Sequence, residues 1–432
     1  MVGVDRRSEQ LSAAIAAGEA RHRAVAAALS GRRRKLPLRY WRQQAHFTTP
    51  AADIAMARKA IEAGTSPMAR ILERVGVSAE ELGDRLGVDS RVIQDLLERP
   101  ARAPLVMLDG EDAQALREDV TQQGLKNASD LLVEADWGAS STLRFFRPPG
   151  FDLPTSVRDL HTVLWSIGER STPQTFPLDG IVFPKIEHPE QVELLYGLLD
   201  DAEAAIGLSS GQIQVAFLIE SAWAAAELAE IVRRAAPRLC ALIFGLADYA
   251  ADLGLPSIAN EHPVADWARA EIVNLAAAAG VPAIDAMTLA YPVPEKSLDA
   301  AANRIRFMDR MALVYADSVH AHEIGMAGKW VGHPAQLFAV LLAHEVAFAP
   351  DLLEAEAAKL AAYTVSVESE AKGAAMIGGV MSDRATDRHA RAVLRQATAL
   401  GRFEPERALA LKLIDQVEIS EARALWNARR PT

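Results

Sequence analysis

Cysteine is almost absent from this chain, and long apolar runs are absent altogether. The 432 residues include one cysteine, Cys240, which lies inside the apolar run LCALIF. A disulfide within the chain is therefore excluded, and Cys240 is expected to be a small buried side chain. No stretch of 18 or more uninterrupted apolar residues is present, and the N-terminus MVGVDRRSEQ lacks the order of a signal peptide. We expect a cytoplasmic protein that has no membrane partner.

Positive charge is also scarce. The net charge of −11 opposes nonspecific binding to nucleic acid, whose phosphates require a basic face. The one basic stretch, GRRRKLPLRYWRQQ at residues 31–44, has two interpretations. It is either a solvated linker or a site for a polyanion such as a phosphorylated cofactor, in which case Arg39 and Arg42 would contact the phosphates.

Short apolar runs alternate with amphipathic helical stretches along most of the chain. Parallel strands need crossover helices and are buried on both faces, so this alternation predicts an α/β fold, a modified (β/α)8 TIM barrel. A doubly wound open sheet is the alternative, but no Gly-x-Gly-x-x-Gly follows the first strand. The runs are HFTT near 46, LVMLDGE at 105, STLRFFRP at 141, GIVFPKIE at 180, IQVAFLIES at 213, LCALIFGLAD at 239, PAIDAMTL at 282 and KWVGHP at 329.

The barrel prediction divides the chain into three parts. Residues 1–44 would form an N-terminal helix and the basic linker, residues 45–348 the barrel, and residues 349–432 a C-terminal helical arm or lid. Residues 66–100 would form a helical insertion after the first strand. Its helix, Gly turn, helix pattern is similar to a helix-turn-helix, but five arginines against seven acids leave it without a phosphate footprint. We favour a small helical cap or a subunit contact.

Charged or titratable residues lie at or just after the C-terminal ends of the apolar runs. In parallel barrels the C-terminal strand ends face the active site, so these residues are predicted to meet on one rim. They are Asp109, Glu111, Asp112, Arg147, Lys185, Glu187, Glu220, Asp248, Asp285 and His333.

Two acids on neighbouring strands suggest a metal site. Glu220 and Asp248 offer hard oxygen ligands, which suit Mg²⁺ (or Mn²⁺) holding several waters better than Zn²⁺. A divalent ion and Arg147 together could bind a 2-oxo acid and stabilise an enolate oxygen, as carbon–carbon bond cleavage beside a carbonyl requires. We assign Lys185 and the segment Gly245, Leu246 and Ala247 to substrate binding. Gly245 would allow close backbone approach, or it would precede a helix that has Asp248 as its N-cap.

Six motifs in order carry a resemblance to a known family. LDGEDA at 108–113, FRPPGFDLPTSVRDL, DGIVFPKIE, FLIESA, FGLADYAADLG and GMAGKWVGHPAQ resemble segments of the HpcH/HpaI aldolase and citrate lyase β-subunit group, which includes malyl-CoA and citramalyl-CoA lyases. The resemblance extends from about residue 45 to 345. It implies that Glu220 and Asp248 ligate Mg²⁺, that Arg147 binds the oxo acid and enolate, and that Glu111 and Asp112 orient Arg147 or metal-bound water.

The resemblance also implies a reaction. It implies reversible cleavage of a 3-hydroxyacyl-CoA thioester by a homo-oligomer, commonly a trimer or hexamer, with the arginines near residues 32–42 meeting the CoA phosphates. Two departures keep alternatives open. MIGGVMSDR has Gly378 where the CoA lyases carry an acid and Val380 where they carry a lysine, and Asp112 stands where the CoA-independent aldolases carry a histidine. The alternatives are a CoA-independent 4-hydroxy-2-oxo acid aldolase and a non-catalytic barrel acting as a binding or regulatory subunit.

Overall fold

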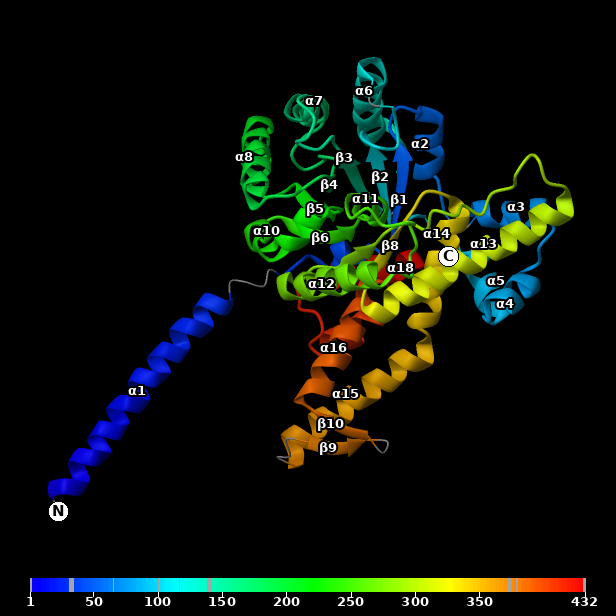
Figure 1. The fold of residues 1–432 in the computed structure, drawn as a ribbon. Coiled ribbons are helices and arrows are strands. Elements are labelled where there is room, and N and C mark those ends of the chain that lie inside the picture. The colour runs from blue at the N-terminus through cyan, green and yellow to red at the C-terminus, as the bar shows by residue number, and fades with distance from the viewer. Residues whose placement is uncertain are drawn as a thin grey trace.

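A computed structural model of the chain describes residues 2–30, 35–64, 66–99, 102–115, 117–137, 142–370, 374–377 and 380–429. Eight parallel strands close into a barrel in the order β1 to β8, which confirms the predicted fold class (Figure 1). Each of the eight apolar runs found in the sequence overlaps one of these strands. The strands are β1 Ala45–Pro50, β2 Leu105–Asp109, β3 Leu143–Arg147, β4 Gly180–Phe183, β5 Gln214–Ile219, β6 Leu239–Phe244, β7 Ala283–Asp285 and β8 Gly328–Val331.

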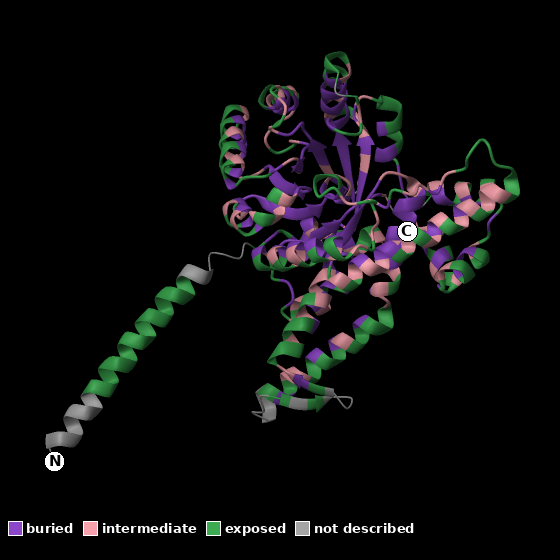
Figure 2. Cartoon of the chain, viewed as in Figure 1, coloured by how far each residue is buried: buried purple, intermediate pink, exposed green. Residues whose placement is uncertain are grey.

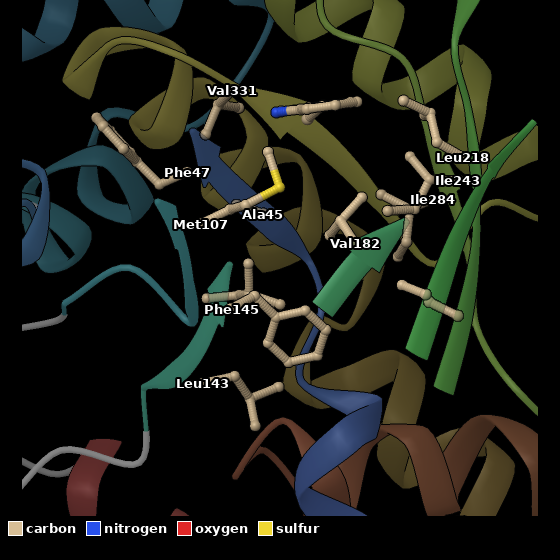
Figure 3. Packing of buried hydrophobic residues seen from close by; sticks show 14 of the residues in the cluster. Ala45, Phe47, Met107, Leu143, Phe145, Val182, Leu218, Ile243, Ile284 and Val331 are labelled. Atoms are coloured by element: carbon tan, nitrogen blue, oxygen red, sulfur yellow. The ribbon is translucent and has the colours of Figure 1, made fainter. Parts of the chain in front are cut away.

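The strands are almost wholly buried because helices cover the outside of the barrel and side chains fill the inside. Every residue of β5 and β6 is buried, which explains why their sequences QVAFLI and LCALIF are continuously apolar or nearly so. Cys240 lies within β6 and is a free, buried thiol, as expected. One core cluster takes side chains from all eight strands, as the labelled residues in Figure 3 show. Figure 2 shows the buried barrel within a partly exposed ring of helices.

The crossover helices return the chain from the end of one strand to the start of the next. They are α2 Ile54–Ile61, α6 Glu118–Glu134, α7 Ser156–Gly168, α8 Pro189–Ile206, α9 Ala222–Ala226, α10 Leu228–Ala235, α11 Leu246–Asp252, α12 Pro263–Ala279 and α13 Ala300–Ile324. Helix α14 Pro334–Ala347 follows the last strand and leads into the C-terminal arm.

Three short helices lie between α2 and β2, where the sequence indicated an insertion: α3 Ser66–Val75, α4 Ala79–Leu86 and α5 Ser90–Glu98. Ser78 and Glu81 form a capping box at the start of α4, and Gly87 ends α4 in the left-handed conformation with φ 67°. Buried side chains such as Met68 and Ile93 join this insertion to the barrel core. The insertion packs beside α13 and α14 (Figure 1).

The two ends of the chain lie outside the barrel. Helix α1 (Val2–Ser30) projects away from it, and every described side chain from residue 10 to 27 is exposed (Figure 2). The C-terminal arm forms a second apolar core with the short helix η1 (Leu38–Trp41). Its elements are α15 Pro350–Glu370, the hairpin β9 Ala374–Ile377 and β10 Val380–Asp383, α16 Arg384–Ala399, α17 Pro405–Ala410 and α18 Ile419–Arg429.

One helical stretch, residues 334–367, has a window with a mean hydropathy of 1.4, which by length and composition suffices to cross a membrane. Of that window, 56% is buried within the fold, as in the core helix of a globular domain.

Candidate active site

The predicted rim surrounds a cavity of about 680 Å³ at the C-terminal ends of the strands. Arg147, Glu220, Asp248, Asp112 and His333 all line it, so the structure brings together residues from five different strand ends. The segment Gly245, Leu246 and Ala247 lines it as well. Such a cavity, with a few convergent polar groups among apolar ones, is the usual form of a small-molecule site.

Arg147 is fixed in place by acids at the end of β2. Its Nε and Nη2 donate to the two carboxylate oxygens of Asp109 at 2.8 and 2.6 Å, and its Nη1 lies 2.9 Å from Glu111 Oε2. The guanidinium also lies over the ring of Trp330, 5.2 Å from its centroid. These contacts hold Arg147 in one orientation while it borders the cavity. Sequence reasoning placed Asp109 on the rim but gave it no role, although it makes the bidentate pair.

Glu220 and Asp248 converge because β5 and β6 are paired and end side by side. Gly245 makes this arrangement possible, since a Cβ at that position would lie 2.5 Å from the Cβ of Glu220. The close approach predicted for Gly245 therefore involves a neighbouring carboxylate side chain. The alternative that Asp248 is a helix N-cap is wrong, because Gly245 is the N-cap of α11 and Asp248 lies in its first turn.

Lys185 supplies a positive charge among these acids. Its Nζ lies 2.8 Å from Asp248 Oδ1, 3.3 Å from Asp112 Oδ2 and 3.7 Å from Glu220 Oε1. Its backbone N–H donates to Glu220 Oε1 at 2.8 Å, and its backbone is left-handed, with φ 51°. Non-glycine residues rarely adopt this conformation, and those that do are often found at functional sites. Burial alone would lower the pKa of Lys185, but Glu220 and the other acids raise it above its ordinary value.

The rim carries more negative than positive charge. Among the described residues, five acids form ion pairs with two cations, Arg147 and Lys185, and with no others: Asp109, Glu111, Asp112, Glu220 and Asp248. Burial raises the pKa of Glu111 to about 8 and that of Glu220 to about 7, despite the opposing effects of Arg147 on the first and Lys185 on the second. Buried carboxylates that are short of positive charge favour an additional cation.

The donor set fits a hard divalent ion. No preformed group of three or more His, Cys, Asp and Glu is present in the part of the chain that the structure describes. The pair Glu220 and Asp248 nonetheless matches the few carboxylates with which Mg²⁺ is commonly held, the remaining ligands being water and substrate. Lys185 would have to withdraw from Asp248 for an ion to bind between the two acids.

Two predicted cofactor residues lie elsewhere. Arg39 and Arg42 precede β1, at the opposite end of the barrel, where Arg39 pairs with Asp179 just before β4. Burial lowers the pKa of Arg42 to about 10. The structure does not bring either residue to the cavity. Arg32, Arg33 and Arg34 lie outside the described residues.

Two of the charged strand ends also turn away from the cavity. Asp285 is fully engaged inside the barrel wall by Arg269 at 2.7 Å and Lys329 at 2.6 Å. Glu187 is exposed beyond β4 and does not line the cavity. His333 does line it, but burial lowers its pKa to about 4, and its Nδ1 accepts a hydrogen bond from the N–H of Ala335.

The apolar walls of the cavity were missed by sequence reasoning. The large apolar and aromatic residues that line it include Trp330, Tyr291, Leu289, Met287 and Phe244. Trp330 lies inside an apolar run that was interpreted only as a strand, and the residues from 287 to 291 follow the shortest strand, in a loop without a helical or strand pattern.

The motif MIGGVMSDR in the C-terminal arm ends with Asp383 and Arg384 at the start of α16. Gly378, which stands where the CoA lyases carry an acid, lies outside the described residues. Asp383 caps α16, where its side chain accepts hydrogen bonds from the N–H groups of Ala385 and Thr386.

Comparison with known proteins finds one matching family model and related enzymes that share one name. Residues 39–425 match a family model described as "Domain of unknown function (DUF6986)". The chain is 29% identical over 311 residues to the L-malyl-CoA/β-methylmalyl-CoA lyase of Rhodobacter capsulatus, covering 68% of this chain and 87% of that protein. It is 30% identical over 281 residues to the enzyme of the same name from Haloarcula marismortui, covering 64% of this chain and 73% of that protein.

A solved structure supports the fold. A citrate lyase from Burkholderia xenovorans LB400 is similar with a TM-score of 0.57 and 20% identity, covering 89% of this chain and 98% of that one. Together the relatives confirm the predicted relationship to malyl-CoA lyases at the level of the family, and they support a carbon–carbon lyase.

Proposed function

The chain belongs to the DUF6986 family, and from this premise and the geometry of its cavity we propose that it is a Mg²⁺-dependent carbon–carbon lyase. Its substrate would be a 3-hydroxyacyl-CoA thioester of the malyl-CoA or citramalyl-CoA type, cleaved or formed through an enolate. The observation that carries this proposal is that Arg147, Glu220 and Asp248 line one cavity at the mouth of the barrel.

The positions of these side chains suggest their roles. Arg147, which Asp109 and Glu111 hold in place, would bind the 2-oxo acid product through its carboxylate or carbonyl oxygen and stabilise negative charge on an adjacent oxygen. Glu220 and Asp248 would hold Mg²⁺, which when bound acts as a Lewis acid towards the carbonyl oxygen. Trp330 and Phe244 would exclude water from the reacting carbons.

The negatively charged rim also restricts what can bind. The four acids that line the cavity, Asp109, Asp112, Glu220 and Asp248, would repel the carboxylate of an oxo acid unless Arg147, Lys185 and a bound cation offset them. This supports a reaction that depends on a divalent cation for substrate binding as well as for chemistry.

The proposal is tested with purified protein, Mg²⁺ and a panel of malyl-, citramalyl- and β-methylmalyl-CoA, following the release of 2-oxo acid. We expect cleavage of at least one thioester, with loss of activity on chelation and in Glu220→Gln. Glu187→Gln is the matched control, because Glu187 is an exposed glutamate at a neighbouring strand end that does not line the cavity.

The alternatives give different results. Deuterium exchange into the methyl group of pyruvate, without any effect of CoA or its thioesters, would replace the proposal with a CoA-independent aldolase. No turnover and no exchange by protein shown to bind Mg²⁺ would favour a binding or regulatory barrel.

A further inference from the structure

A second cavity adjoins the candidate active site and is bounded by the insertion. It has a volume of about 470 Å³ and shares Thr48, Met56, Gly332 and His333 with the first cavity. Four of its lining residues, Pro67, Arg70, Ile71 and Arg74, belong to helix α3, so the insertion forms part of its wall.

Three cations border this second cavity, and no acid does among the residues that the structure describes. They are Lys59 at the end of α2 and Arg70 and Arg74 on α3. Arg70 and Arg74 are four residues apart on one helix, so both side chains extend from the same face. None of the three makes an ion pair or side-chain hydrogen bond with any residue that the structure describes. Two other arginines of the insertion are engaged, Arg85 with Asp309 and Arg99 with Glu345.

The wall beneath the cations is apolar. Phe47, Ala60, Pro67, Ile71 and Pro334 contribute to it. The opposite side of α3 buries Met68 and Leu72 in the core, so the backbone that carries the two arginines is anchored. An apolar surface edged by unpaired cations suits an organic group that carries phosphates.

We propose that this cavity binds the phosphate-bearing nucleotide end of the substrate, with Arg70, Arg74 and Lys59 contacting the phosphates while the acyl end lies at Arg147. The proposal rests on the proposed function in assuming a CoA thioester. It assigns to the insertion the role that the sequence gave to Arg39 and Arg42. The net charge of the insertion hid this role, because none of its seven acids lines the cavity.

The test measures binding without catalysis. Two ligands are titrated separately into the full chain with Mg²⁺, and binding is measured by calorimetry. The first is adenosine 3′,5′-bisphosphate, which represents the nucleotide end of CoA. The second is pyrophosphate, which carries phosphates but no base. We expect the bisphosphate to bind, and its Kd to rise at least about tenfold in Arg70→Gln/Arg74→Gln, as loss of charge-assisted contacts predicts. Arg91→Gln is the control, because Arg91 is an exposed arginine of the same insertion that lies outside the cavity.

Three binding outcomes would overturn the proposal. They are no binding of the bisphosphate, equal Kd values in the double variant and the wild type, and pyrophosphate binding as tightly as the bisphosphate, which would indicate a phosphate site without a nucleotide. Because Arg70 and Arg74 are exposed, circular dichroism should show that the double variant retains its fold.

Kinetics separate this proposal from the proposed function. In an active enzyme the double variant should raise KM for the CoA thioester at least about tenfold with little change in kcat, and leave KM unchanged for a pantetheine thioester that lacks the nucleotide. Nucleotide binding that depends on Arg70 and Arg74 in a protein without turnover would refute the lyase and retain the cavity. Turnover that is unaffected by the double variant would support the lyase and refute nucleotide binding in this cavity.

Discussion

Gly245 shows how one missing side chain shapes the candidate active site. A Cβ at this position would lie 2.5 Å from Glu220 Cβ and 3.0 Å from Glu220 Oε2. Gly245→Ala should therefore displace Glu220 and weaken Mn²⁺ binding measured by calorimetry, at a stability cost of about 1 to 3 kcal/mol. Gly197→Ala is the control, because a Cβ at Gly197 in α8 would have no neighbouring atom within 4 Å, and the substitution should be neutral or stabilising. Unchanged metal affinity in Gly245→Ala would contradict the placement of Glu220.

Lys185 allows a second test at the scale of the residue. Without its ammonium, Asp248, Asp112 and Glu220 lose their shared positive partner. Lys185→Met should be less stable than the wild type without metal and should gain more in Tm from Mg²⁺, because the ion then binds without displacing the lysine. The control is Lys126→Met, which removes an exposed ammonium that pairs with Asp130 in α6. A smaller Mg²⁺-induced rise in Tm for Lys185→Met than for the wild type would mean that the lysine assists metal binding.

The sequence predicted much of the rim because each buried strand must end where its side chains can meet water or a ligand. That reasoning placed Arg147, Glu220 and Asp248 correctly at one end of the barrel. It could not distinguish Asp285, which follows the same pattern but is neutralised by Arg269 from α12 and Lys329 from β8. The partners of a buried charge come from distant segments, and a single sequence does not reveal them.

At the scale of the element, Asp285 ties the shortest barrel strand to its surroundings. Strand β7 has three residues, and its last carboxylate joins α12 to β8 through two buried ion pairs. Asp285→Asn should lower the free energy of unfolding by about 3 kcal/mol, since two buried cations lose their counter-charge. The matched control is Asp266→Asn, which removes a half-exposed partner of the same Arg269 and should cost about 1 kcal/mol or less. Urea unfolding of both variants measures these free energies. Equal losses in the two variants would contradict this role of β7.

The insertion and the basic linker show where element-level prediction failed. The pattern of residues 66–100 predicted helices, and three were found, but a net charge could not show which face of α3 carries Arg70 and Arg74. The basic linker predicted that Arg39 would contact phosphates at the active site. Instead, Arg39 lies at the far end of the barrel, where its side chain pairs with Asp179. Its backbone N–H donates a hydrogen bond to Glu421. Glu421 belongs to α18, so the position of the linker depends on the other end of the chain.

At the scale of the whole molecule, one carboxylate connects three parts of the chain. Glu345 on α14 pairs with Arg99 at the end of the insertion at 2.9 Å, with Arg402 in the C-terminal arm, and with Arg429 at the end of α18 at 2.6 Å. The side chain of Glu345 is 11% exposed, so these contacts are poorly screened by solvent. Burial would raise its pKa, but the three arginines, Arg402 foremost, lower it to about 2.

This cluster predicts how stability depends on pH. A carboxyl whose pKa is lower in the folded chain stabilises the fold above its unfolded pKa of 4.5, and this contribution is lost as pH falls towards 2. The shift corresponds to about 3 kcal/mol at neutral pH, which is an upper bound because burial also lowers the pKa of Arg402 to about 10. Glu345→Gln should therefore be less stable than the wild type at pH 7, by up to about 3 kcal/mol, and the difference should shrink by roughly half at pH 3. Urea unfolding at several pH values measures it, with Glu354→Gln as control for an exposed pair with Arg407. A difference between Glu345→Gln and the wild type that stays constant with pH would show that the three arginines do not act on the ionised carboxylate.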